Sequence, residues 1–266
     1  MKIVIVTGAS SGIGEEFVKQ LDQNFQRIDE IWMIARSEKK MEDIASGLEN
    51  KVRILPFDLE KREDIELFSD ILAVEKPGIC MLVNCAGFGV MGNFQDLAIE
   101  EQLEMIELNC KALTKITYLC LPYMIRNGRI LQVASSAAFS PQAGFAVYAA
   151  TKSYVLSFSR ALQEEVRSKE IFITAVCPGP VDTPFFERAE KGGHTLLLKK
   201  KFTVTAERVV HDALIASKKR KTVSVCSLPM KAFHGACKLL PHDWILEIAQ
   251  YFAGKEQEKE NEKEIS

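Results

Sequence analysis

Short apolar runs and longer amphipathic stretches alternate along the chain. The short runs are rich in β-branched residues and predict strands at Lys2–Thr7, Glu30–Ala35, Val52–Pro56, Ile79–Asn84, Arg129–Ala134, Ile171–Cys177 and Thr222–Cys226. In the longer stretches apolar residues recur at helical spacing, which predicts helices at Ile13–Asn24, Ser37–Leu48, Arg62–Glu75, Glu100–Tyr123, Tyr148–Ser168 and Ala206–Ser217. Because the strands are apolar along nearly their whole length, we expect an α/β fold: a doubly wound parallel sheet of about seven strands, with helices on both faces.

The alternation continues to about residue 226 without a linker, so we expect one domain over residues 1–226. Residues 227–253 form an apolar segment, expected to be a helical extension of that domain. Three interpretations of it stay open: a lid, a subunit contact, or a helix at a membrane surface. The first two are favoured because its polar positions are only weakly basic. The charged stretch 254–266 is typical of disorder, and residues 179–205 are typical of a loop that covers a site.

The composition narrows the possible partners. Of the 266 residues, 47% are apolar and 26% are charged, and the formal net charge is −2. No overall basic field recruits nucleic acid, and the basic runs at 199–201 and 218–221 are interpreted as solvated. No apolar run approaches the roughly 18 residues that span a membrane. Seven cysteines without a Cys-x-x-Cys pair argue against disulfides and metal sites, which predicts a cytoplasmic protein without a metal.

The stretch TGASSGIG directly follows the first predicted strand. A turn needs one glycine, whereas this stretch has three. The first permits a tight turn, the second lets the backbone approach a ligand, and the third lets the next helix pack on the strand. The helix N-terminus then offers unpaired N–H groups to a pyrophosphate, which favours a dinucleotide site over a simple turn. The cofactor-binding residues predicted here are Gly8, Ser10, Ser11, Gly12, Ile13 and Gly14.

The end of the second predicted strand distinguishes the two nicotinamide dinucleotides. An Asp or Glu there would read the ribose hydroxyls of NAD, but this strand ends in Arg36 and Ser37. A guanidinium pairs well with a 2′-phosphate, so NADP(H) is the predicted cofactor. The alternative is an ordinary surface arginine at the start of a helix.

Tyr148 and Lys152 are spaced to share one face of a helix. A tyrosine is a weak acid-base catalyst at neutral pH, and an adjacent ammonium lowers its pKa. The pair follows the strand at 129–134, whose carboxyl end is where ligands bind in such sheets. Ser135 lies where that strand ends and could hydrogen-bond a substrate oxygen; Ser136 is the alternative if the register differs by one.

Together these motifs resemble the short-chain dehydrogenase/reductase family, of the compact single-domain kind with a Rossmann-type sheet. The resemblance covers residues 2 to about 226 and is carried by TGASSGIG, FDL, NCAG, ELNCKAL, Ser135, YAATK and PGPVDT, in family order. One departure is Cys85, where the family usually has asparagine. That side chain takes no part in the chemistry, so the departure puts little in doubt.

The resemblance implies roles for individual residues. It assigns cofactor contacts to Asp58, Leu59, Asn84, Ala86, Gly87, Pro178, Gly179, Val181 and Thr183. Asn109 would distort its helix and bind a water in a proton relay. Ser135 would polarise the substrate oxygen, Tyr148 would exchange its proton, and Lys152 would lower the tyrosine pKa and hold the nicotinamide ribose. Hydride would move between the nicotinamide and a carbonyl carbon, and the family habit implies a homodimer or homotetramer.

The residues expected around the substrate are mostly apolar. They are Phe88, Val90, Met91, Phe139, Gln142, Phe145, Phe185, Phe186 and 196–198. We expect no Arg or Lys there for a substrate carboxylate or phosphate, which favours a bulky apolar ketone or secondary alcohol of steroid, bile-acid or fatty-acyl type, as in a hydroxysteroid dehydrogenase. The alternatives are a 3-ketoacyl or small-carbonyl reductase, and a catalytically silent NADP(H) sensor. A nucleotide-sugar epimerase is disfavoured, because only about 40 residues follow the last predicted strand.

Overall fold

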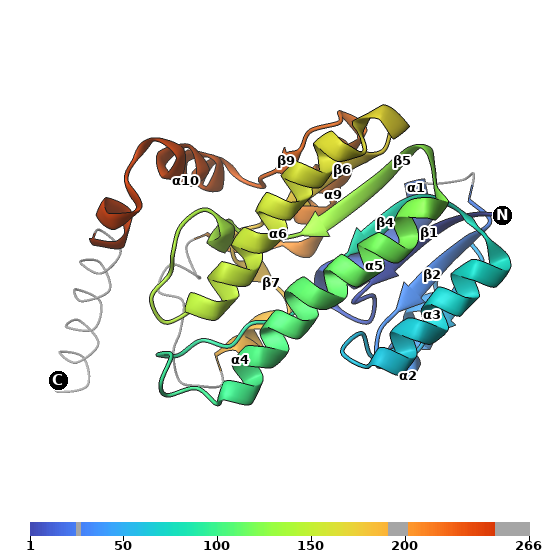
Figure 1. Cartoon of the computed structure of the whole chain (residues 1–266), viewed down its shortest axis with the longest axis horizontal. Coiled ribbons are helices and arrows are strands. Elements are labelled where there is room, and N and C mark those ends of the chain that lie inside the picture. Colours follow the sequence, from blue (N-terminus) through green and yellow to red (C-terminus); the bar gives the residue numbers. More distant parts are fainter. Residues whose placement is uncertain (25–27, 191–201, 248–266) are drawn as a thin grey trace.

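The computed structural model describes residues 1–24, 28–190 and 202–247. Within these residues a seven-stranded parallel sheet has the strand order β3-β2-β1-β4-β5-β6-β9. The strands are β1 (Lys2–Thr7), β2 (Glu30–Ile34), β3 (Val52–Leu55), β4 (Gly78–Asn84), β5 (Met124–Val133), β6 (Phe172–Val176) and β9 (Val223–Ser224). Helices cover both faces (Figure 1), so the predicted doubly wound α/β fold of Rossmann type is confirmed.

Two groups of helices sandwich the sheet. The helices are α1 (Gly12–Asn24), α2 (Glu38–Ala45), α3 (Arg62–Glu75), α4 (Ile99–Ile106), α5 (Leu113–Cys120), α6 (Ala146–Glu165), α7 (Phe185–Ala189), α9 (Ala206–Lys218) and α10 (Leu228–Leu239). Figure 1 shows α3, α5 and α6 in front of the sheet, whereas α1 and α9 lie behind it. Each face has its own apolar core, because alternate strand residues point to opposite sides. Val4 and Val6 pack with α1, α2 and α9, whereas Ile3 and Ile5 pack with α3 and α5.

Local sequence sets where several of these elements begin and end. α9 begins after Thr205, whose hydroxyl accepts a hydrogen bond from the Arg208 N–H at 3.3 Å, as an N-cap threonine does. α3 ends at Lys76, which takes a left-handed conformation with φ 45° and donates its N–H to the Leu72 carbonyl.

The helix expected at 100–123 is interrupted. Between α4 and α5, residues Glu107–Ala112 form a π-helical segment, which contains the buried Asn109. A π-helical turn widens a helix by one residue and is common at functional sites. Here it aims the Asn109 amide at the loop after β4.

The segment expected as a loop at 179–205 is partly ordered. It contains α7 and a small parallel pair of strands, β7 (Val181–Asp182) and β8 (Val204–Thr205), while 191–201 lie outside the described residues. Among the residues that the structure describes, no helix is long and apolar enough to cross a membrane.

The C-terminal apolar segment forms α10, which projects from the end of the body (Figure 1). Phe233 and Cys237 on its inner face pack against a buried cluster that includes Val155 of α6 and Ala175 of β6. The His234 ring stacks on Phe139, with ring centres 4.2 Å apart. Its outer face leaves Leu239 85% exposed. The rest of the expected segment 227–253, from 248 on, and the stretch 254–266 lie outside the described residues.

Candidate active site and cofactor cleft

A cavity of about 460 Å³ opens where β1 and β4 meet, at the carboxyl ends of the strands. From β1 the chain goes to β2 and β3 on one side, and it then crosses to β4 on the other side. Such a reversal of strand order leaves a crevice between the loops, which is the usual ligand site of a doubly wound sheet. The volume lies within the range of small-molecule and cofactor sites.

The glycine turn after β1 forms one wall of this cavity, as the sequence predicts. Gly8 has φ +67°, and a Cβ there would lie 2.8 Å from the Ala86 N atom. A Cβ on Gly14 would lie 2.0 Å from the Gly8 carbonyl oxygen, so α1 can start this close to β1 only with glycine. Gly12 has φ +55° and faces Thr183. The turn leaves a backbone cradle at the start of α1 that suits a pyrophosphate.

Thr7 joins the two strands at the base of the crevice. Its buried hydroxyl oxygen accepts hydrogen bonds from the Cys85 and Ala86 N–H groups, each at 3.1 Å. These bonds hold the loop after β4 against the end of β1. The Cys85 thiol lies in the cavity wall, and burial raises its pKa to about 12, so it stays protonated and poorly reactive.

One end of the cavity is lined by charged side chains. Arg36 and Ser37 follow β2 into this wall, with Asp58 and Leu59 beside them. The Arg36 Nη1 lies 3.9 Å from the Glu60 carboxylate, and 61% of the Arg36 side chain is exposed. Two further residues line this end that we did not predict, Lys40 and Glu60. Lys40 is four residues after Arg36, a helical spacing that was visible in the sequence.

The other end brings together three of the four residues expected to do the chemistry. Ser135, Tyr148 and Lys152 all line the cavity, and Ser136 lines it as well. The Ser135 hydroxyl accepts the Ala137 N–H at 3.1 Å and is close enough to the Tyr148 phenol to lower its pKa. The Lys152 Nζ donates to the Val133 carbonyl at 2.9 Å, which fixes the ammonium between β5 and α6.

Burial dominates the protonation of this pair. It raises the pKa of the Tyr148 phenol, while the neighbouring Ser135 hydroxyl acts in the opposite direction. It lowers the pKa of Lys152 to about 8, against weaker opposing effects of Cys85, Cys110 and Cys177. The expected lowering of the tyrosine pKa by Lys152 is not seen in this structure, because the loss of solvent around the phenol raises that pKa.

Asn109 and Asn84 lie just outside the cavity wall. The Asn109 amide accepts the Phe88 N–H at 3.1 Å and donates to the Phe88 carbonyl at 2.9 Å and to the Thr151 hydroxyl at 3.1 Å. The Asn84 amide donates to Thr117 and Gln132, and its oxygen is buried without a hydrogen-bond partner. Asn109 thus supports the loop after β4, and Asn84 links β4, β5 and α5.

The remaining predicted cofactor residues also line the cavity. They are Ala86, Gly87, Pro178, Gly179, Val181 and Thr183. Gly179 faces α10, because a Cβ there would lie 2.8 Å from the Met230 sulfur. The turn after β6 is therefore in contact with the C-terminal helix.

The predicted substrate wall is only partly in place. Five of the expected residues line the cavity: Phe88, Gln142, Phe145, Phe185 and Phe186. Val90 and Met91 are buried beside it in an apolar cluster, and Phe139 packs on α10 instead. Residues 196–198 lie outside the described residues.

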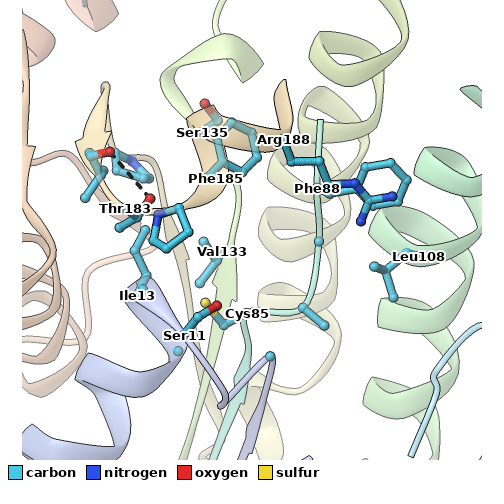
Figure 2. A pocket seen from close by; sticks show the side chains of 18 of the residues that line it. Ser11, Ile13, Cys85, Phe88, Leu108, Val133, Ser135, Thr183, Phe185 and Arg188 are labelled. Atoms are coloured by element: carbon cyan, nitrogen blue, oxygen red, sulfur yellow. Dashed lines mark hydrogen bonds between the residues drawn. The ribbon is translucent and has the colours of Figure 1, made fainter. Parts of the chain in front are cut away.

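Arg188 overturns the expectation that no Arg or Lys lies in this wall. It lines the cavity with its guanidinium carbon 3.5 Å from the centre of the Phe88 ring. Figure 2 shows this stacked pair across the cavity from Ser11, Ile13 and Thr183. No helical or strand periodicity marks the segment around Arg188, so only its nearness to PGPVDT could have drawn attention to it.

Comparisons with known proteins agree with this geometry. Residues 2–193 match the family model described as short chain dehydrogenase. An uncharacterized oxidoreductase of Staphylococcus epidermidis is 31% identical over 193 residues, which are 72% of this chain and 83% of that protein.

Solved structures share the fold over most of the chain. A short-chain dehydrogenase from Sphingobium yanoikuyae in complex with NADPH is 26% identical, with a TM-score of 0.76 over 90% of this chain and 94% of that one. The closed form of serine dehydrogenase complexed with NADP+ is 31% identical, with a TM-score of 0.71 over 81% of this chain and 88% of that one. A Burkholderia phymatum member in complex with NAD, 17% identical with a TM-score of 0.76 over 92% of this chain and 95% of that one, shares the fold.

Proposed function

Because the chain belongs to the short-chain dehydrogenase family, we propose that it is an NADP(H)-dependent oxidoreductase that interconverts a ketone and a secondary alcohol on a bulky apolar substrate. The observation that carries this proposal is the placement of Ser135, Tyr148 and Lys152 in one wall of a cavity whose other wall is the glycine turn. A catalytically silent sensor would need the turn but not the acid-base tyrosine.

The chain's own residues supply binding and proton transfer. Bound NADPH would supply the hydride that reduces the ketone, and bound NADP+ would accept the hydride when the alcohol is oxidised. The glycine turn would hold the pyrophosphate, with Ser10, Ser11 and Ile13 beside it, while Pro178, Gly179, Val181 and Thr183 would hold the nicotinamide end. Tyr148 exchanges a proton with the substrate oxygen, and the Ser135 hydroxyl orients that oxygen. Lys152 stabilises the phenolate through its ammonium charge. Asn109 hydrogen-bonds Phe88 in the loop after β4 and Thr151 on α6, and so positions the loop and the helix from which the proton path starts.

The proposed preference for NADP(H) rests on the charged end of the cavity. Arg36 and Lys40 line it, and β2 ends without an acid at the position that reads the ribose hydroxyls of NAD. Asp58 and Leu59 would lie against the adenine, with Asn84, Ala86 and Gly87 near the adjoining ribose. The two solved relatives at 26% and 31% identity carry NADPH and NADP+, which supports the same choice.

The proposed substrate class rests on the aromatic wall. Phe145 stacks on Tyr148 with ring centres 4.2 Å apart, and Phe185 lies 5.5 Å from the same ring. These rings exclude water from the phenol and give an apolar substrate surface to pack on. A steroid, bile-acid or fatty-acyl ketone matches such a wall, and a small carbonyl compound would leave most of it uncovered. By family habit we propose a homodimer or homotetramer, in the cytoplasm, where the seven free cysteines stay reduced.

The experiment follows oxidation of NADPH, and separately of NADH, with ketosteroids, oxidised bile acids, 3-ketoacyl esters and small ketones. We expect NADPH-dependent turnover of at least one bulky ketone. Turnover of small ketones alone would overturn the substrate class. Tight NADPH binding without any turnover would instead favour the catalytically silent sensor. Such a protein would use the same fold to bind NADP(H) and a partner.

A further inference from the structure

Gly89, in the loop after β4, lies against the edges of the Tyr148 and Phe145 rings and does not itself line the cavity. A Cβ at this position would lie 2.7 Å from the Tyr148 Cδ2, and 2.8 and 2.9 Å from the Phe145 Cζ and Cε2. Real Cβ atoms do not approach other heavy atoms this closely, so a side chain fits here only if a ring moves. The φ of Gly89 lies outside the left-handed region, so the backbone conformation itself does not call for glycine.

The loop is held in place on both sides of Gly89. Before it, the Asn109 amide accepts the Phe88 N–H at 3.1 Å and donates to the Phe88 carbonyl at 2.9 Å. After it, the Gly92 N–H donates to the Gly144 carbonyl at 2.9 Å, which ties the loop to the segment in front of α6. An added side chain at Gly89 would therefore displace the rings before it displaced the backbone.

The surroundings of the Tyr148 ring decide how it can move. A turn about χ2 would shift Cδ2 and leave the hydroxyl in place, because the hydroxyl oxygen lies on that rotation axis. Phe145 blocks this turn, since its ring is stacked on the tyrosine with centres 4.2 Å apart and an interplanar angle of 18°. Phe185 limits the ring from another direction, with centres 5.5 Å apart. Relief of the contact therefore needs a change in χ1, which swings the hydroxyl at the far end of the ring.

We propose that Gly89 is a positioning residue for Tyr148: because it has no side chain, the enclosed phenol can lie where it exchanges a proton with the substrate. This proposal rests on the proposed acid-base role of Tyr148. Proton transfer needs its partners within hydrogen-bond distance, and a misplacement of about 1 Å can cost about 100-fold in rate. Since Gly89 does not line the cavity, it acts on the chemical step and leaves the surfaces that bind cofactor and substrate in place.

The test is a double-mutant cycle of Gly89→Ala with Tyr148→Phe, measured as oxidation of NADPH by a ketone that the wild type reduces. For Gly89→Ala alone we expect kcat to fall by about 10- to 100-fold, with KM and NADPH affinity within about twofold of the wild type. In the Tyr148→Phe background no hydroxyl remains to be misplaced, so the same substitution should change kcat by less than about threefold. Gly47→Ala is the matched control and should leave kcat unchanged, because its Cβ would meet only the Ile44 carbonyl oxygen, at an ordinary 3.8 Å.

Phe145→Leu provides a second, less crowded background. It removes two of the three close contacts with a Cβ at Gly89, so the double variant also serves if Gly89→Ala alone does not fold. Without the stacked ring, Tyr148 can turn about χ2, and Gly89→Ala should then cost less than about threefold in kcat. A loss of tenfold or more in this background would overturn the proposal.

The outcomes separate this proposal from the one it rests on. If the wild type reduces no ketone, or if Tyr148→Phe turns over normally, the proposed function itself is wrong. If Tyr148→Phe loses turnover and Gly89→Ala does not, only the role of Gly89 is overturned. Equal losses from Gly89→Ala in the wild-type and Tyr148→Phe backgrounds would show that the substitution disturbs packing without acting on the phenol, which also overturns it.

Discussion

The Lys152 ammonium nitrogen lies 5.6 Å from the centre of the Tyr148 ring and is tied to the Val133 carbonyl. The two side chains come from successive turns of α6, so their separation is set by helix geometry and is insensitive to loop motion. This rigid pair is the basis of the first prediction. Tyr148→Phe removes the exchangeable proton and keeps the ring, so we expect turnover to fall by about 10²–10⁴-fold.

Cofactor binding should survive the same change. Tyr148→Phe preserves the stacking on Phe145, so NADPH affinity, measured by quenching of protein fluorescence, should stay close to that of the wild type. Near-normal turnover would refute the acid-base role of the tyrosine.

Arg36→Asp tests coenzyme choice. The substitution replaces a cation in the cavity wall by an anion, which repels a 2′-phosphate and can accept hydrogen bonds from ribose hydroxyls. We expect the ratio of kcat/KM for NADPH over NADH to fall by roughly 10- to 100-fold. Arg208→Asp serves as the control, because Arg208 is exposed on α9. An unchanged ratio in Arg36→Asp would mean that Arg36 is only a surface residue.

The depressed pKa of Lys152 makes stability depend on pH. Its pKa is about 8 in the folded protein and 10.5 in the unfolded chain, so between these values the unfolded chain binds more protons and stability rises with pH. From pH 7 to pH 9 we expect this residue to add about 1 kcal/mol to the free energy of unfolding. The measurement is urea unfolding of the wild type and of Lys152→Met at both pH values. The titration of the cysteines cancels when the free energies of unfolding of the two proteins are subtracted. If the wild type does not gain stability relative to Lys152→Met between pH 7 and pH 9, the argument is contradicted.

Thr7→Val tests the link between β1 and the loop after β4. The substitution keeps the shape and leaves the Cys85 and Ala86 N–H groups without their shared acceptor. We expect a loss of about 2 kcal/mol in the free energy of unfolding, because buried donors without a partner are costly. Thr7→Ser keeps the hydroxyl and should lose much less. Equal losses in both variants would assign the effect to the methyl group.

Gly14→Ala tests the close approach of α1 to the turn. An added Cβ would meet the Gly8 carbonyl oxygen at 2.0 Å, so the helix must move. We expect about 3 kcal/mol or more of destabilisation together with loss of cofactor binding. Gly235→Ala is the matched control on α10, where an added Cβ meets nothing within 4 Å. It should stabilise by about 0.5–1 kcal/mol, because alanine favours a helix.

The sheet could be predicted because its signal is local. Ile3 to Val6 are all fully buried, so a continuous apolar run was the correct sign of a covered parallel strand. The length of β9 was harder to predict. A strand of five residues was expected at Thr222–Cys226, and only Val223 and Ser224 pair with β6. An edge strand has one neighbour, so its length depends on that neighbour and not on its own composition.

The site was predictable where spacing carries the chemistry. The interval from Tyr148 to Lys152 and the three glycines place side chains through helix and turn geometry alone. Phe139 and Arg188 were misjudged because their positions depend on contacts with distant parts of the chain. Phe139 stacks on His234, 95 positions later in the chain, and Arg188 lies over Phe88. Such pairings have no period in the sequence.

The contact of α10 with the turn after β6 matters for anyone who wishes to redesign this enzyme. Gly179 faces Met230, and Phe139 stacks on His234, so two stretches of the active-site rim rest on the C-terminal helix. If these rim segments were replaced by those of another protein, the new segments would not fit against α10 and would lose their shape. Residues 135–145, 178–184 and 227–247 therefore form one exchangeable unit, and a chimera should carry all three or none.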